Sequence, residues 1–292
     1  MKRSTSRFRR GTILGWVVAF VALALAGCLS FSAPPARSES GPPPAAVRAV
    51  GAPPAAQAPR AVERLRVKVL ATYPHDPGAF TQGLVWRDGS LYESTGLYGR
   101  STLRRVNHET GEVLQQTVLD PRLFGEGLAD LGDRLLMITW RENVALAFDP
   151  STFQKNGEYQ YTGEGWGLCY DGGRLVMSTG SSSLTFRDPQ TFQSTGTLPV
   201  TADGRPMDQL NELECVGDRV YSNVWMTDTI LRIDAATGQV DATIDASGLL
   251  TDTDRIGADV LNGIAYIPED GTFLITGKLW PKLFKVQFVA AP

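Results

Sequence analysis

The stretch FGEGLAD, from Phe124 to Asp130, is one of five similar segments spaced along the chain. The others are FTQGLVW from Phe80, GEGWGLCYDG from Gly163, LNELECVGD from Leu210 and VLNGIAYIPEDG from Val260. Aligned on one position, they place in register Gln82, Glu126, Trp166, Asn211 and Asn262. The spacings are 44, 40, 45 and 51 residues. A recurring period of this size indicates a repeat architecture.

Each of the five segments is followed by a turn such as RDGS or LGDR and then by further short apolar runs. From about residue 64 onward the alternation of apolar and polar residues, broken by DG, TG, GD and GG, predicts an all-β fold. Four strands in a copy of roughly 45 residues is the size of a propeller blade. Five copies therefore predict a five-bladed β-propeller with four antiparallel strands in each blade.

The fifth copy ends at about Phe288, after only three strands. The segment RLRVKVLATY, from Arg64 to Tyr73, has no other partner in the pattern. We expect it to supply the missing outer strand, so that the two ends of the chain share one blade and no sheet edge is left exposed there.

Glu126 lies between two glycines, a pattern that fits either a hairpin tip or a crowded interior. In a propeller the first strand of each blade lines the central channel, so the five aligned positions are predicted to converge near one mouth. Glu126 is then a channel carboxylate, and the glycine after it reflects the close approach of neighbouring strands.

A second ring is predicted about fourteen residues after the first. It contains indoles, glycines and one cation, at Gly96, Trp140, Gly180, Trp225, Gly277 and Lys278. Large indoles alternating with glycines predict a cavity whose wall is built by some blades and left open by others.

The N-terminal residues have the pattern of an export signal. Five basic residues occur up to and including Arg10, and an apolar run from Ile13 ends in LAGC at Leu25 to Cys28, which resembles the bacterial lipoprotein processing box. We expect residues 1–27 to be a signal peptide and Cys28 to carry a lipid, although an ordinary signal with a chance cysteine is the alternative. Residues 28–63, rich in Pro and Ala, predict a disordered tether before a folded domain at 64–292.

The composition of the chain excludes some classes of partner and of active site. Without the five basic signal residues the chain retains 23 Lys and Arg against 31 Asp and Glu, a formal charge of −8. This argues against a nucleic-acid partner. His75 and His108 are the only histidines, which leaves little for a His-rich zinc site or a Ser-His-Asp triad. Cys169 and Cys215 could pair or stay as buried free thiols.

Several motifs resemble the glutaminyl-peptide cyclotransferases of the plant and bacterial five-bladed propeller type. They run from about Val67 to Phe288 and include AFTQGLVW, LYESTGLYGRS, FGEGL, GWGL, QLNELE, NVWMTD, VLNGIAY and TGKLWPKLF. The resemblance implies conversion of the N-terminal glutamine of peptides to pyroglutamate with release of ammonia, without a catalytic metal or other cofactor. It implies site residues at Phe80, Gln82, Glu126, Trp140, Trp166, Asn211, Trp225 and Lys278.

The residue types agree with that chemistry. Lactam closure needs a neutral α-amine, and a single carboxylate such as Glu126 can accept its proton and pass it to the leaving nitrogen. Burial among tryptophans should raise the pKa of Glu126, while Lys278 should oppose the shift. Gln82 and Asn211 can bind the amide or the amine of the substrate, and Lys278 or a donor amide can stabilise the developing oxyanion.

We expect a monomeric lipoprotein of the cell envelope, on the periplasmic or outer-membrane face.

Two alternatives remain. A six-bladed calcium-dependent lactonase would place Glu126, Asn211 and Asn262 around a metal ion, but it requires six repeats rather than five. A non-catalytic binding module would not require polar channel residues, all of which are present. A structural channel ion such as calcium stays open. Glu212 and Glu214 are interpreted as structural carboxylates, one of which is expected to bond the backbone of a neighbouring blade.

Overall fold

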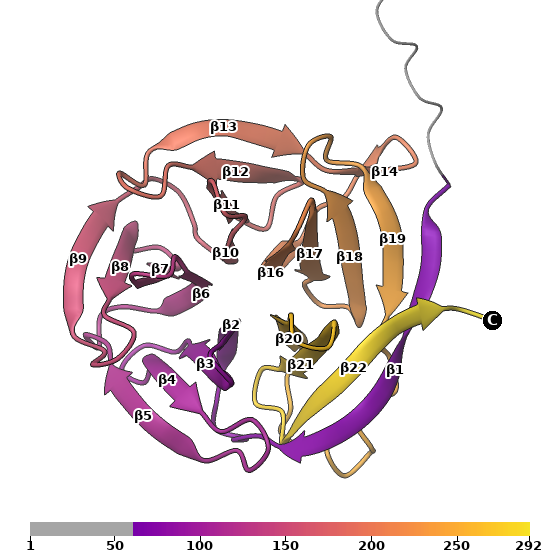
Figure 1. The fold of residues 1–292 in the computed structure, drawn as a ribbon, viewed down its shortest axis with the longest axis horizontal. Helices are drawn as coiled ribbons and strands as arrows, with labels where there is room; N and C mark the ends of the chain where they lie inside the picture. Colours follow the sequence, from indigo (N-terminus) through magenta and orange to yellow (C-terminus); the bar gives the residue numbers. More distant parts are fainter. Residues whose placement is uncertain (1–60) are drawn as a thin grey trace, which may run out of the picture. The chain divides into compact units, whose positions relative to one another are not determined.

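The computed structural model describes residues 61–292, which form an all-β domain without a helix (Figure 1). Within this range, accordingly, no helix is long and apolar enough to cross a membrane. The predicted signal peptide, Cys28 and the tether up to residue 60 lie outside the described residues. The first strand begins at Glu63, one residue before the predicted domain boundary.

Three separate four-stranded antiparallel sheets follow one another in the chain. The first contains β2 (Thr81–Arg87), β3 (Ser90–Thr95), β4 (Thr102–Val106) and β5 (Val113–Val118). The second contains β6 (Gly125–Asp130), β7 (Leu135–Thr139), β8 (Val144–Phe148) and β9 (Lys155–Gln160). The third contains β10 (Leu168–Tyr170), β11 (Leu175–Met177), β12 (Ser183–Arg187) and β13 (Ser194–Pro199). In each sheet the predicted opening strand lies nearest the centre (Figure 1).

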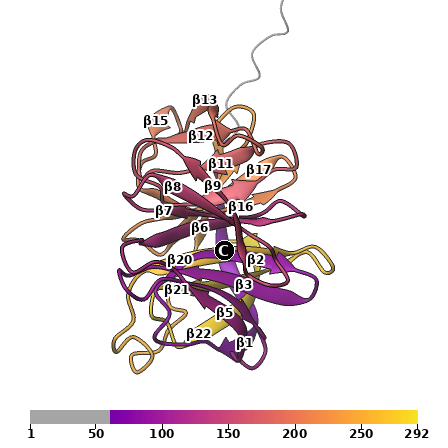
Figure 2. The same ribbon diagram turned by 90° about the vertical axis from the view of Figure 1, so that its left-hand side faces the viewer.

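The remaining strands form one eight-stranded sheet and one short hairpin. The sheet has the order β16 (Leu210–Val216), β17 (Arg219–Val224), β18 (Thr229–Asp234), β19 (Val240–Asp245), β1 (Glu63–Pro74), β22 (Lys282–Ala290), β21 (Thr272–Gly277) and β20 (Leu261–Ile267). The hairpin pairs β14 (Thr201–Ala202) with β15 (Arg205–Pro206). Each of the five predicted opening segments therefore contains a strand: β2, β6, β10, β16 and β20. In the turned view β2, β6, β16 and β20 lie at mid-height between β13 and β1 (Figure 2).

β1 is the N-terminal strand that the sequence placed beside the last repeat. It pairs antiparallel with β22, from Leu65 opposite Ala290 to Pro74 opposite Lys282. It also pairs parallel with β19, from Glu63 opposite Ala242 to Arg66 opposite Asp245. The first pairing confirms the prediction. The second was not predicted, and it makes β1 the strand that joins two groups of strands into one sheet.

Burial decreases from the centre outward. β2 and β6 are buried at nearly every position, whereas β5 and β9 alternate between exposed and half-buried residues. Inner strands are covered on both faces by neighbouring sheets, so both faces must be apolar or hydrogen-bonded. The apolar cores lie between sheets: Tyr92 and Leu103 of the first sheet pack in one cluster with Leu128 and Met137 of the second.

The glycine after Glu126 confirms the predicted crowding. A Cβ atom at Gly127 would lie 2.6 Å from the carbonyl carbon of Gly167, on the neighbouring inner segment. Since real Cβ atoms do not approach backbone atoms so closely, only glycine allows the two inner segments to meet here.

Two carboxylates of β16, the buried Glu212 and the half-buried Glu214, both bond the backbones of other inner strands, whereas the sequence predicted one such bond. Glu212 Oε1 accepts a hydrogen bond of 3.3 Å from the backbone N–H of Leu84, and Glu214 Oε1 accepts one of 2.8 Å from that of Tyr266. Burial raises the pKa of Glu212 well above its ordinary value and that of Glu214 to about 8. These carboxylates connect β16 with β2 and β20 around the centre.

Cys169 and Cys215 form a disulfide, which settles the alternative that the sequence left open. Their Cα atoms are 5.5 Å apart, and the residues lie on β10 and β16. The bond therefore links the inner strand of the third sheet to that of the eight-stranded sheet.

A buried ion pair fixes the segment that leads into β2. His75 Nδ1 donates to the carbonyl oxygen of Trp280 at 2.7 Å, and Nε2 donates to Glu93 Oε1 at 3.1 Å. Both partners are acceptors, so the ring carries two protons. Burial alone would lower the pKa of His75, but the charge and hydrogen bond of Glu93 outweigh it and raise the pKa. The imidazolium holds Trp280, two residues after Lys278, against the start of the first sheet.

Candidate active site

The eight predicted site residues line one cavity of about 410 Å³. They are Phe80, Gln82, Glu126, Trp140, Trp166, Asn211, Trp225 and Lys278. Asn262, the fifth aligned position, is not part of the wall; its side-chain N–H donates to the carbonyl oxygen of Thr81 at 2.9 Å.

Antiparallel pairing explains why the two predicted rings meet at one end of the sheets. Gly125 at the start of β6 is opposite Thr139 at the end of β7, and the backbone N–H of Trp140 donates to the carbonyl oxygen of Phe124 at 3.0 Å. The same arrangement places Lys278, whose N–H donates to Val260 O at 2.9 Å, beside the start of β20. Residues about fourteen positions apart are thus neighbours at the mouth of the cavity.

Glu126 is the buried carboxylate of this cavity, with 5% of its surface exposed. Gln82 Nε2 donates to its Oε1 at 3.1 Å. Burial raises the pKa of Glu126 well above its ordinary value; the positive charge of Lys278 opposes this, while Glu142 and Glu164 add to it. A carboxyl with a raised pKa exchanges protons near neutral pH more readily than an exposed one.

Lys278 is buried, and it is the residue whose positive charge acts on the pKa of Glu126. Burial lowers the pKa of Lys278, while the charges of Glu126 and Asp259 act in the opposite direction. The ammonium nitrogen lies 5.0 Å from the centre of the Phe80 ring, within the range of a cation–π contact. The cavity wall therefore holds one buried carboxyl group, Glu126, and one buried amine, Lys278.

Aromatic rings form most of the remaining wall. Trp166 and Trp225 meet edge to face with their ring centres 5.5 Å apart, and Phe124 lies 5.5 Å from Trp140. Flat, rigid rings of this kind can hold a flexible substrate side chain in a folded conformation.

The prediction that glycines of the second ring leave the wall open is wrong. A Cβ atom at Gly180 would lie 2.7 Å from the indole of Trp166, and one at Gly96 would overlap the ring of Phe124. Each glycine provides the space in which an aromatic ring of the cavity lies, so the wall is closed at these positions.

Four lining residues were missed by the sequence analysis: Leu97, Phe124, Met226 and Asp259. Phe124 directly precedes the Gly-Glu-Gly motif, and Met226 directly follows Trp225, so adjacency to predicted residues could have indicated both. Leu97 and Met226 adopt φ of 85° and 65°, which non-glycine residues seldom do, and this conformation carries no sequence signature here.

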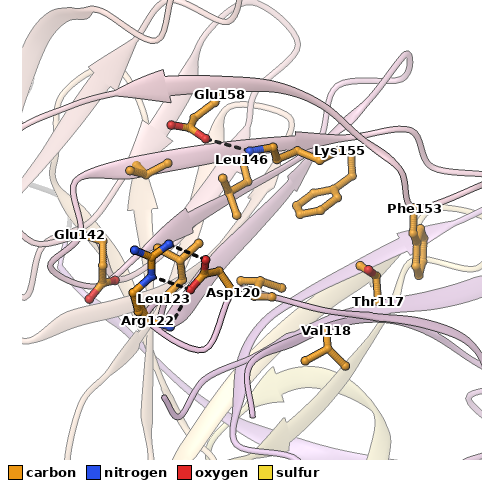
Figure 3. Close-up of a pocket in the computed structure, with 13 residues that line it drawn as sticks. Thr117, Val118, Asp120, Arg122, Leu123, Glu142, Leu146, Phe153, Lys155 and Glu158 are labelled. Atoms are coloured by element: carbon orange, nitrogen blue, oxygen red, sulfur yellow. Dashed lines mark hydrogen bonds and ion pairs between the residues drawn. The ribbon is translucent and has the colours of Figure 1, made fainter. Parts of the chain in front are cut away.

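A second cavity, of about 640 Å³, lies away from these residues, beside β5, β8 and β9 (Figure 3). Four of its charged side chains form two ion pairs: Arg122 pairs with Asp120 at 2.7 Å, and Lys155 with Glu158 at 2.9 Å (Figure 3). The fifth, Glu142, accepts hydrogen bonds from Tyr98 and the backbone N–H of Phe124. This second cavity has no buried acid or base directed at a common point. The cavity around Glu126 is therefore the candidate site, although its volume is the smaller of the two.

Among residues 61–292, no three His, Cys, Asp or Glu side chains lie close enough together to hold a metal ion.

Comparison with known proteins gives one consistent result. The family model described as glutamine cyclotransferase matches residues 44–288. A glutaminyl-peptide cyclotransferase of Arabidopsis thaliana is 42% identical over 231 residues, which cover 77% of this chain and 72% of the relative. The crystal structure of Myxococcus xanthus glutaminyl cyclase superposes with a TM-score of 0.72 at 39% identity, covering 79% of this chain and all of that one.

Proposed function

Because the chain belongs to the glutamine cyclotransferase family, we propose that it converts the N-terminal glutamine of peptides and proteins to pyroglutamate, as a glutaminyl-peptide cyclotransferase. The observation that carries this proposal is the single buried carboxylate, Glu126, at the wall of an aromatic cavity that also holds Lys278. One carboxylate is what an intramolecular aminolysis needs, because the same proton is removed from the amine and returned to the leaving group.

The proposed reaction begins with the neutral α-amine of the substrate. A peptide amine has an ordinary pKa of about 7.7 to 8.0, so a neutral fraction exists near pH 7. The amine nitrogen attacks the γ-carboxamide carbon and forms the C–N bond of the lactam, while Glu126 accepts a proton from that nitrogen. Glu126 then gives the proton to the amide nitrogen, the old C–N bond breaks, and ammonia leaves.

The neighbouring residues support this sequence of steps. Gln82 holds the carboxylate of Glu126 through the 3.1 Å hydrogen bond. The buried ammonium of Lys278 is suited to stabilise the negative charge that develops on the γ-oxygen. Asn211, which lines the same cavity, can bind the α-amine or the first peptide carbonyl. The indoles hold the glutamine side chain folded, so that amine and carboxamide meet.

The direct test is ammonia release by the purified protein from a dipeptide that begins with glutamine. We expect turnover with the Gln peptide, and none with the same peptide acetylated at its α-amine, because the nucleophile is then blocked.

We propose that no metal takes part, since the proton transfers need only Glu126. Ammonia release should therefore persist when a chelator removes divalent metal ions. Loss of activity on chelation, restored by calcium, would contradict this and favour a metal-dependent propeller hydrolase.

We further propose that residues 64–292 are a five-bladed propeller. The support is the division of the eight-stranded sheet into two meanders, β16 to β19 and β20 to β22 with β1, each with four strands like the three separate sheets. The parallel contact of β1 with β19 then joins the outer strands of two blades.

For localisation, we propose an exported lipoprotein of the cell envelope anchored through Cys28, on the basis of the LAGC motif and the Pro- and Ala-rich residues after it. Replacing Cys28 by Ser should move the protein from the membrane fraction to the soluble fraction, because a lipidated cysteine is the proposed anchor. Cyclotransferase activity per folded molecule should not change, since the tether separates lipid from cavity. Equal membrane association of wild type and Cys28→Ser would contradict lipidation at this residue.

A further inference from the structure

One carboxylate outside the predicted site contacts two of the cavity indoles. Glu164, in the segment between β9 and β10, accepts hydrogen bonds at Oε2 from Trp140 Nε1 at 2.9 Å and from Trp166 Nε1 at 3.1 Å. Trp140 follows β7 of the second sheet, and Trp166 precedes β10 of the third. A single oxygen atom therefore connects indoles that belong to neighbouring sheets.

We propose that Glu164 is a positioning residue for the cyclisation: it fixes Trp140 and Trp166 in the orientation that encloses the substrate beside Glu126. This inference rests on the proposed function. Glu164 is separate from the proton transfer, and it acts on the reaction through the two rings.

The geometry explains why one carboxylate has this influence. An indole has a single N–H donor and no acceptor, so the direction of that bond fixes the rotation of the ring. Two donors that share one oxygen constrain both rings together, because turning either ring breaks its bond. Trp166 in turn meets Trp225 edge to face at 5.5 Å, so the constraint extends to a third indole of the wall.

Arg141 holds Glu164 from the outer side. Its Nε donates to Glu164 Oε1 at 2.9 Å, and its guanidinium lies 3.7 Å from the centre of the Trp140 ring. Burial alone would raise the pKa of Glu164, but the hydrogen bonds from the two indoles and Arg141, together with the charge of Arg141, outweigh it and lower the pKa. Glu164 is therefore an ionised acceptor whose second oxygen is already occupied.

Glu164 has two effects that substitutions can separate. As an acceptor it orients the indoles, and as a negative charge it adds to the raised pKa of Glu126. Glu164→Ala removes both effects. Glu164→Gln removes the charge but keeps a carbonyl oxygen that can accept the indole N–H groups.

We expect Glu164→Ala to lower kcat/KM roughly 10- to 100-fold, the range expected when reacting groups are slightly misplaced. Glu164→Gln should stay within about threefold of the wild type at its own pH optimum. Both variants should shift the acid limb of the kcat profile to lower pH. Glu142→Gln is the matched charge control: Glu142 also raises the pKa of Glu126, but it bonds Tyr98 and Phe124 rather than indoles. It should shift the acid limb without the loss seen in Glu164→Ala.

Two further measurements complete the test. Glu158→Gln, on β9 away from the cavity, should behave as the wild type. Hydrogen exchange at the indole N–H groups of tryptophan-labelled protein should show two resonances losing protection in Glu164→Ala but not in Glu164→Gln. Wild-type kcat/KM in a folded Glu164→Ala variant, or equal losses in the Ala and Gln variants, would overturn the proposal. Wild-type ammonia release tests the proposed function alone, whereas indole protection tests the contact whether or not the enzyme is active.

Discussion

Replacing Glu126 by Gln is expected to lower kcat by about 10² to 10⁴, the usual contribution of general acid–base catalysis. The substitution keeps the size of the side chain and its ability to accept the hydrogen bond from Gln82, but an amide cannot take the amine proton. The Michaelis constant should change much less, because the aromatic wall that binds the substrate is intact. Steady-state ammonia release from a Gln dipeptide measures both quantities.

Two other cavity substitutions provide the contrast. Trp225→Ala and Asn211→Ala should weaken binding and turnover together, since these residues orient the substrate and move no proton. If Glu126→Gln cyclises the peptide at a near-normal rate, Glu126 is not the proton shuttle and is a structural carboxylate of the channel.

The raised pKa of Glu126 also gives a stability effect whose sign can be stated. The folded state binds the proton of this carboxyl more tightly than the unfolded chain, where the value is near 4.5. The corresponding stabilisation is complete below pH 4.5 and is lost as the pH rises through the raised folded value. Glu126→Gln should therefore have a higher melting temperature than the wild type at pH 8, and the difference should shrink towards pH 4. Cyclotransferase activity needs the ionised form of Glu126, so it should rise as the pH is raised from 4 to 8.

The repeat made most of the fold and the site predictable. Gln82, Glu126 and Asn211 occupy one position of an aligned strand, so a correct alignment placed them together without any knowledge of contacts. Trp140 and Lys278 followed because antiparallel pairing puts the end of the second strand beside the start of the first. In a repeat fold, spacing in sequence is converted directly into position around the centre.

Features that depend on irregular segments could not be predicted in this way. Glu164 lies between strands, where the repeat does not determine side-chain direction, so its contacts with two indoles appear only in the structure. The space beside Gly180 was interpreted as open because sequence does not show which neighbouring ring fills it. The disulfide likewise required the distance between Cys169 and Cys215, which two strands in different sheets determine.

Removing the chain through Tyr73 is expected to abolish the soluble folded state. β1 pairs with β22 along most of its length and with β19 at its start, so its loss exposes two strand edges rather than one. Unpaired edges are templates for association with other chains. Leu65 and Val67 of β1 also pack against the apolar cluster that contains Phe284 and Val286, and this cover would be lost. Sedimentation and thermal unfolding should show aggregation and no cooperative transition.

The matched control is a chain that begins at Arg60, which keeps every strand of the described domain. It should remain soluble, unfold cooperatively and release ammonia at the wild-type rate, so that a defect of the longer deletion belongs to β1 and not to the N-terminal segment. A substitution within β1 separates chain loss from edge exposure. Lys68→Pro removes the N–H of a residue that lies opposite Gln287 in a hydrogen-bonding position of the ladder, and it should lower the melting temperature without removing any chain. A chain lacking residues 1–73 that stays monomeric, with the melting temperature of the control, would show that the sheet does not need β1 to join β19 to β22.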